Sequence, residues 1–91
     1  MLEELDELSK ITAEICKKNG WTKDWQRGGC YLHLEVSEFI EALRGKGDPI
    51  DEMSDVFFTL LSTGWCYGVK PSEAIARLVE KHGIEEGAYG N

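Results

Sequence analysis

The sequence predicts an all-α fold, a four-helix bundle, and the spacing of its apolar residues is the main reason. Four segments repeat apolar residues at steps of three and four, which is the period of one face of an α-helix. No segment alternates apolar and polar residues as a half-buried strand would. The 91 residues are enough for one domain, 1–91, with a thin core. We therefore expect homo-oligomerisation to complete the bundle.

The helices are delimited by capping and breaking residues. The third helix has the strongest start signal, because Asp48 suits the N-cap and Pro49 the first helical position. Its middle, 56–61, is apolar nearly all the way round, which suggests burial against a second subunit. The tail 85–91 is glycine-rich and is expected to be flexible. The four expected helices cover residues 2–19, 30–44, 49–67 and 71–82.

The segment 21–29 is predicted to be a connector between the first two helices. Thr22 or Asp24 could cap a short helical turn within it. Gly28 and Gly29 follow and are expected to break the helical pattern before the second helix begins.

The composition narrows the class of protein. The net charge of −7, from 17 acidic and 10 basic residues, does not fit a nucleic-acid-binding protein, which usually has a basic surface. The three cysteines form no C-x-x-C pair, so buried, reduced thiols are expected rather than disulfides or a zinc site. The acidic N-terminus does not resemble a signal peptide, and no apolar run is long enough to span a membrane. These features predict a soluble, cytoplasmic protein.

Two acidic pairs carry the strongest chemical signal. Glu35 and Glu38 are three residues apart on the second helix, and Glu52 and Asp55 are three apart on the third. Residues with that spacing are neighbours on a helix surface, so each pair directs two carboxylates the same way. Because a short glycine-containing turn joins the helices, they must run antiparallel, which brings the two pairs towards each other.

Four converging carboxylates would repel one another and lose hydration unless a cation neutralised them. Mg²⁺ suits such a group, because it prefers oxygen ligands and often also binds substrate phosphates. A bound Mg²⁺ would favour hydrolysis of a phosphoanhydride. A di-iron carboxylate site, by contrast, needs Glu-x-x-His, and neither His33 nor His82 has a glutamate three residues before it.

The arrangement Glu35-x-x-Glu38, thirteen residues, Glu52-x-x-Asp55 resembles the signature of the MazG-like, all-α NTP pyrophosphatase superfamily. The similarity extends over roughly 29–82 and includes the G-V-x-P-x-E-A start of the last helix. It implies hydrolysis of a nucleoside triphosphate to the monophosphate and pyrophosphate by a homodimer or a dimer of dimers. It also implies that Mg²⁺, or Mn²⁺ in its place, is held by the four acids, which would be both metal ligands and catalytic residues.

Several other residues are candidates for substrate binding. Basic side chains could contact phosphates, and an aromatic ring could stack on a base. Trp21 is expected mainly to cover one end of the bundle, and Tyr31 is a further stacking candidate. Many relatives carry a Lys/Arg/Asn cluster after the last helix, which this chain largely lacks, so a non-catalytic MazG-like module that binds a nucleotide or protein is the alternative. The predicted substrate-binding residues are Trp25, Lys23, Arg27, Arg77 and Lys81.

Overall fold

The computed structural model describes residues 2–21 and 24–84. These residues form helices and turns without any strand, which confirms the all-α prediction. The predicted flexible tail, 85–91, lies outside the described residues, as do Thr22 and Lys23. The helices are α1 (Leu2–Lys18), α2 (Trp25–Leu43), α3 (Pro49–Cys66) and α4 (Pro71–Lys81).

Helix α2 begins five residues earlier than the sequence predicts, and Gly28 and Gly29 lie inside it. Asp24 is its N-cap, because its Oδ1 accepts a hydrogen bond from the Arg27 backbone N–H at 2.8 Å. The Gly28 N–H donates to the Asp24 carbonyl at 2.7 Å. The prediction of a connector over 21–29 is therefore wrong from Trp25 onward, since a good cap and tertiary packing offset the low helix propensity of glycine.

Helix α3 begins as predicted. Asp48 is its N-cap and accepts a hydrogen bond from the Ile50 backbone N–H at 3.0 Å, while Pro49 is the first helical residue. The turn before it contains Gly45 and Gly47, both with positive φ. Glycine adopts that conformation at little cost, so the chain can reverse direction within a few residues.

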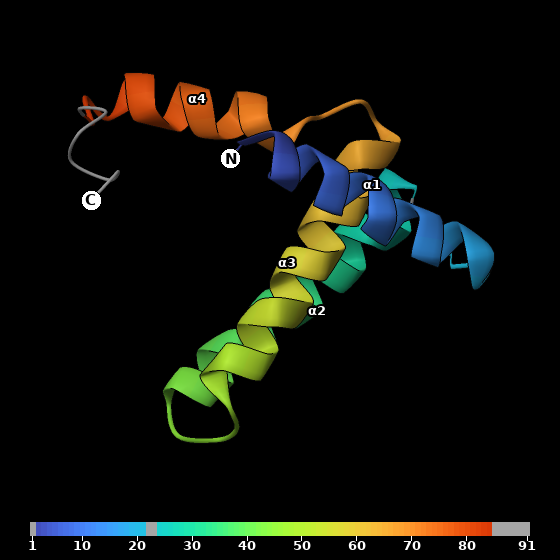
Figure 1. Ribbon diagram of the computed structural model, residues 1–91. Coiled ribbons are helices and arrows are strands. Elements are labelled where there is room, and N and C mark those ends of the chain that lie inside the picture. The colour runs from blue at the N-terminus through green and yellow to red at the C-terminus, as the bar shows by residue number, and fades with distance from the viewer. Residues whose placement is uncertain (1, 22–23, 85–91) are drawn as a thin grey trace.

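Helices α2 and α3 form an antiparallel hairpin, and α1 crosses the end of the hairpin that is far from its turn (Figure 1). Helix α4 extends from that same end and packs against α1 (Figure 1). Asp6 of α1 holds the start of α4, because its carboxylate accepts hydrogen bonds from the Ser72 N–H at 3.0 Å and the Ser72 hydroxyl at 2.6 Å. Lys70, the N-cap residue of α4, makes no side-chain capping bond.

The buried residues of α1 and α3, two helices that pack against each other, are small. Ser9, Thr12 and Cys16 are buried on α1, and Thr59 and Ser62 are buried on α3. Two of the hydroxyls are satisfied within their own helices, since Thr12 donates to the Ser9 carbonyl at 2.7 Å and Ser62 to the Thr59 carbonyl at 3.3 Å. Small side chains let the two helix backbones approach closely, which leaves little volume for a large apolar core.

The apolar core of this one chain is therefore small. Cys16 and Ala42 are its fully buried apolar residues among those described, while large side chains on every helix remain exposed. All three cysteines are free, and Cys16 is buried as predicted, but the predicted burial is wrong for Cys30 and Cys66, which are exposed. Cys66 is the last residue of α3, and Cys30 lies two positions after the buried Gly28, on a different side of α2. No helix in the described part of the chain is long and apolar enough to cross a membrane.

Candidate metal centre and adjoining cleft

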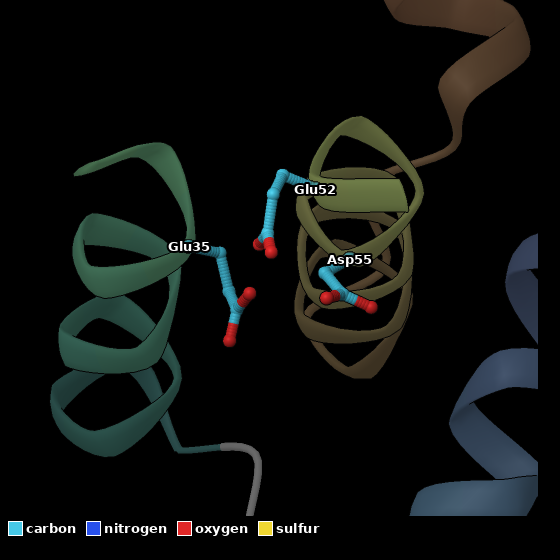
Figure 2. A group of neighbouring side chains, drawn as sticks. All are labelled: Glu35, Glu52 and Asp55. Atoms are coloured by element: carbon cyan, nitrogen blue, oxygen red, sulfur yellow. The ribbon is translucent and has the colours of Figure 1, made fainter. Parts of the chain in front are cut away.

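Three of the four predicted acids meet between α2 and α3. Glu35 extends from the middle of α2, and Glu52 and Asp55 extend from the first two turns of α3 (Figure 2). Each of the three offers a carboxylate oxygen, and these oxygens lie within 4.8 Å of one another. The antiparallel hairpin produces this meeting, because residues at similar distances from the turn face each other, and Glu35 lies eight residues before the end of α2 while Asp55 lies six residues after the start of α3.

The approach leaves two of these carboxylates partly dehydrated. Glu35 Oε2 and Glu52 Oε2 are buried, and neither atom has a hydrogen-bond partner among the described residues. Burial raises the pKa of Glu35, and the negative charges of Glu38, Asp55 and Glu52 raise it further. The pKa of Glu52 is raised first by burial and then by the charges of Glu38, Asp55 and Asp51. Carboxylate oxygens are the ligand type that hard divalent cations prefer, so Glu35, Glu52 and Asp55 could hold such an ion.

Glu38, the fourth predicted acid, lies beside this group. Its charge is the largest electrostatic cause of the raised pKa at both Glu35 and Glu52. It is nevertheless not among the three residues whose oxygens all lie within 4.8 Å of one another. The structure therefore brings Glu35, Glu52 and Asp55 into one cluster and leaves Glu38 at its edge, on an exposed position of α2.

The nearest basic residues in the hairpin turn do not neutralise the cluster. Arg44 pairs with Glu41 at 2.9 Å, and Lys46 lies 3.7 Å from the other oxygen of the same glutamate. Glu41 thus attracts both cations, although it is not part of the four-acid motif. The acids between α2 and α3 keep an excess of negative charge that the described ion pairs do not offset.

A cleft of about 470 Å³ adjoins the acidic cluster and shares Glu35 with it. Arg27, Tyr31 and Glu35 follow one another at four-residue steps, so they share one face of α2. Trp21 forms another wall, and its ring meets that of Phe58 edge-on, with centroids 6.4 Å apart and an interplanar angle of 76°. The cleft thus combines two half-exposed aromatic rings and one guanidinium with an acid of the cluster. Its lining is Gly20, Trp21, Arg27, Tyr31, Glu35, Phe58 and Thr59.

Of the predicted substrate-binding residues, Arg27 lines this cleft. Trp25 is 68% exposed and is not among the residues that line it, while its backbone N–H donates to the Tyr67 hydroxyl at 2.7 Å. Arg77 and Lys81 line a separate cleft of about 520 Å³ along α4, together with His82. Lys23 lies outside the described residues.

Phe58 was predicted only as part of the apolar run 56–61 of the third helix, and Trp21 mainly as a cover for one end of the bundle. The step of four from Arg27 through Tyr31 to Glu35 was a usable signal, but it was hidden by the expectation that residues 21–29 are not helical. The pairing of Trp21 with Phe58 depends on how α1, α2 and α3 pack, so no local pattern in the sequence indicates it.

Comparisons with protein-family models, with curated proteins and with solved structures found no match for this chain. Any statement about its function therefore depends on the residues of the site and on the chemistry that they allow.

Proposed function

We propose that the protein is a Mg²⁺-dependent nucleoside triphosphate pyrophosphohydrolase that cleaves the α–β phosphoanhydride to give a nucleoside monophosphate and pyrophosphate. House-cleaning of abnormal nucleotides or control of a nucleotide pool is the role that fits such a reaction. The proposal rests on the order and spacing of the four acids, which resemble those of MazG-like pyrophosphatases, together with the geometry of the site.

The observation that carries the proposal is a pair of buried carboxylate oxygens, Glu35 Oε2 and Glu52 Oε2, that have no hydrogen-bond partner in the described part of the chain. Leaving a charged oxygen dehydrated and unpaired is costly, and protonation or a cation are the two remedies. Asp55 provides a third oxygen at the same place, which makes a divalent cation the better remedy near neutral pH. The residues present thus fit Mg²⁺, with Mn²⁺ as a substitute.

The chain's own groups have distinct roles in the proposed reaction. Glu35, Glu52 and Asp55 would hold the metal, which when bound polarises the phosphates and lowers the pKa of water. Glu38, whose side chain interacts with those of Glu35 and Glu52, would complete the ligand set or accept a proton from the attacking water. Arg27 lies on the same face of α2 as Glu35, so its guanidinium would bind a phosphate and offset the charge that builds up there.

The decisive experiment is a substrate panel of canonical and modified nucleoside triphosphates, assayed with Mg²⁺ and with EDTA. We expect Mg²⁺-dependent release of pyrophosphate rather than orthophosphate, and its loss by at least about 100-fold in Glu38→Gln, the range expected for loss of a general base. Glu7→Gln, an exposed change on α1, is the matched control. Orthophosphate as the product, or no turnover across the whole panel, would contradict the proposal.

A non-catalytic module that binds a nucleotide or a protein partner is the second candidate. It is favoured by the position of Arg77 and Lys81 on α4, which packs against α1 rather than beside the acidic cluster within one chain. This candidate predicts that calorimetry detects binding of metal and nucleotide without hydrolysis. Hydrolysis that disappears in Glu38→Gln would exclude it.

A further inference from the structure

A second cleft lies between the C-terminal half of α1 and the end of α3. Its volume is about 390 Å³, which is within the range of small-molecule sites. It shares no residue with the acidic cluster. Trp21 is placed in its wall by the end of α1, because the Trp21 backbone N–H donates to the Cys16 carbonyl at 2.9 Å and so folds the chain back over the last turn. The lining is Lys10, Ala13, Glu14, Cys16, Lys17, Trp21, Trp65 and Cys66.

The α1 side of this cleft carries an excess of positive charge. Lys10 and Lys17 are both exposed and lie seven residues apart, so they share one face of α1 at a separation of about 10 Å along its axis. Glu14 lies between them and offsets one of the two charges. Within the part of the chain that the structure describes, none of these three side chains forms an ion pair. A chain with a net charge of −7 repels most anions, but this face of α1 attracts them.

Two indole rings provide the apolar walls of the cleft. Trp21 is 53% exposed, and Trp65 is half-buried at the end of α3. Tryptophan offers a large, flat apolar surface together with one N–H donor. The cleft therefore combines ammonium groups for an anionic end with aromatic surface for a flat apolar body. This combination favours an organic anion over a bare inorganic ion.

Two free thiols also line the cleft and differ in their accessibility. Cys66 is exposed, whereas Cys16 is only 1% exposed. A reagent in the cleft therefore reaches the Cys66 sulfur far more readily than that of Cys16. The chain thus carries a natural chemical reporter inside the cleft.

We propose that the cleft between α1 and the end of α3 binds a small organic anion with a flat, apolar framework, of which an aromatic carboxylate is the simplest example. Lys10 and Lys17 attract the carboxylate, and the ring packs against the two indoles. The site goes beyond the proposed function, because it lies apart from the acids and its occupation needs neither Mg²⁺ nor hydrolysis. The bound anion would nevertheless contact Trp21, which also lines the cleft beside the acids.

The first test measures how fast Cys66 reacts with two aromatic disulfides in the full-length Cys30→Ser protein, which lacks the other exposed thiol. Dithiobisnitrobenzoate carries two carboxylates, whereas dithiodipyridine is uncharged. In both reactions the Cys66 thiolate attacks one sulfur of the reagent, a mixed disulfide forms, and the other half leaves as a coloured thiolate or thione. We expect the rate with dithiobisnitrobenzoate to saturate as its concentration rises, because the anion binds before it reacts.

The double variant Lys10→Gln/Lys17→Gln should slow the reaction with dithiobisnitrobenzoate by roughly 10-fold at low salt, and that with dithiodipyridine by less than about 2-fold. The matched control is Lys18→Gln/Lys46→Gln, which changes the net charge equally at two exposed lysines outside the cleft and should have little effect on either rate. An equal loss with both reagents, or an equal loss in the control variant, would overturn the role of the two lysines.

The second test needs no variant and is performed in EDTA. Naphthoate, a flat aromatic carboxylate, should protect Cys66 from dithiodipyridine with a saturable concentration dependence, whereas neutral naphthalene methanol and inorganic phosphate should protect much less. Absence of protection by naphthoate at millimolar concentration would overturn the proposal. Protection by phosphate as strong as that by naphthoate would also overturn it, since the indoles would then have no role. Neither test involves pyrophosphate release, so the proposed hydrolysis and this site stand or fall separately.

Discussion

At the scale of single residues, Glu35 and Glu52 link the acidic site to the stability of the whole chain. Their pKa values lie above the ordinary value of 4.5, because of burial first and the neighbouring charges of Glu38 and Asp55 next. The folded protein therefore holds these protons more tightly than the unfolded chain does. By linkage, the contribution of these two groups to the free energy of unfolding of the metal-free protein falls as the pH rises above 4.5.

Glu35→Gln tests this coupling directly. Without metal, the substitution should raise the melting temperature at pH 7 by several degrees, because it removes one of the mutually repelling charges, and it should matter much less near pH 4.5. Magnesium at about 100 times its Kd should stabilise wild-type protein by about 2.7 kcal/mol at pH 7 and Glu35→Gln far less. Differential scanning fluorimetry at both pH values, with and without Mg²⁺, measures these changes.

Glu7→Gln on α1 is the matched control, since Glu7 is exposed and lies outside the acidic cluster. It should shift neither the pH dependence nor the stabilisation by Mg²⁺. If Glu35→Gln instead lowers the stability of the metal-free protein at pH 7, the carboxylate has a favourable partner and the proposed repulsion is not the dominant effect.

At the scale of helices, the two adjacent glycines of α2 should respond to alanine in opposite ways. A Cβ at Gly28 would lie 2.8 Å from Thr63 Cγ2 and 3.0 Å from its Oγ1, whereas a Cβ at Gly29 would meet nothing within 4 Å. Gly29→Ala should therefore stabilise the protein by about 0.5–1 kcal/mol through helix propensity alone. Gly28→Ala should be less stable than Gly29→Ala by about 1–3 kcal/mol, because α2 and α3 must separate or Thr63 must leave its rotamer.

Urea unfolding followed by circular dichroism measures both changes in the free energy of unfolding. The double variant Gly28→Ala/Thr63→Ala should recover most of the loss, since it removes the two atoms that the new methyl group would meet. Equal stability of Gly28→Ala and Gly29→Ala would show that α2 and α3 lie farther apart at Gly28 and Thr63 than they do in the structure.

The contrast between the starts of α2 and α3 shows what the sequence could and could not predict. Asp48 and Pro49 act through local chemistry, a side-chain cap and a fixed φ, so the start of α3 was predictable. Gly28 is helical partly because it lets α2 pack against Thr63, which is thirty-five positions away in the sequence. The same limit applies to the site. Spacing predicted that the two acidic pairs approach each other, and three of the four acids do, whereas the wall formed by Trp21 and Phe58 exists only through packing.

The attachment of α4 gives a further prediction at this scale. Ser72→Ala should destabilise the protein by about 1 kcal/mol, because it removes the hydroxyl that donates to Asp6 at 2.6 Å. Asp6→Ala should cost more, since the Ser72 N–H also loses its acceptor. The Ser72 hydrogen bonds lower the pKa of Asp6, so their stabilisation is present above its ordinary pKa of 3.8 and is lost as the pH falls below that value.

Hydrogen exchange of the α4 amides, measured by mass spectrometry, should locate the effect of both Ser72→Ala and Asp6→Ala in α4. Ser54→Ala is the matched control, because the Ser54 hydroxyl donates to a carbonyl within its own helix at 2.6 Å and joins no two helices. Faster exchange in α2 rather than in α4 would contradict a local role for the Asp6 contact.

At the scale of the whole molecule, the surface of one chain leaves a large apolar area uncovered. A groove of about 450 Å³ runs between α1, α3 and α4 and is lined almost entirely by apolar side chains. Leu8, Phe57 and Leu60 line it and are each about half exposed. Soluble monomers rarely expose large contiguous apolar patches, and a domain this short has few buried apolar residues with which to remain folded. We therefore keep the prediction that the chain self-associates, and we expect this groove to be the interface.

Phe57→Glu tests that location, because it places a charge on the apolar lining of the groove. We expect wild-type protein to be an oligomer in light scattering after size-exclusion chromatography, with a melting temperature that rises with protein concentration. Phe57→Glu should shift the protein towards monomer, remove the concentration dependence and lower the melting temperature. Ile50→Glu is the control, since Ile50 is 82% exposed at the other end of α3 and does not line the groove. A monomeric wild-type protein, or dissociation by Ile50→Glu alone, would show that the groove between α1, α3 and α4 is not the interface.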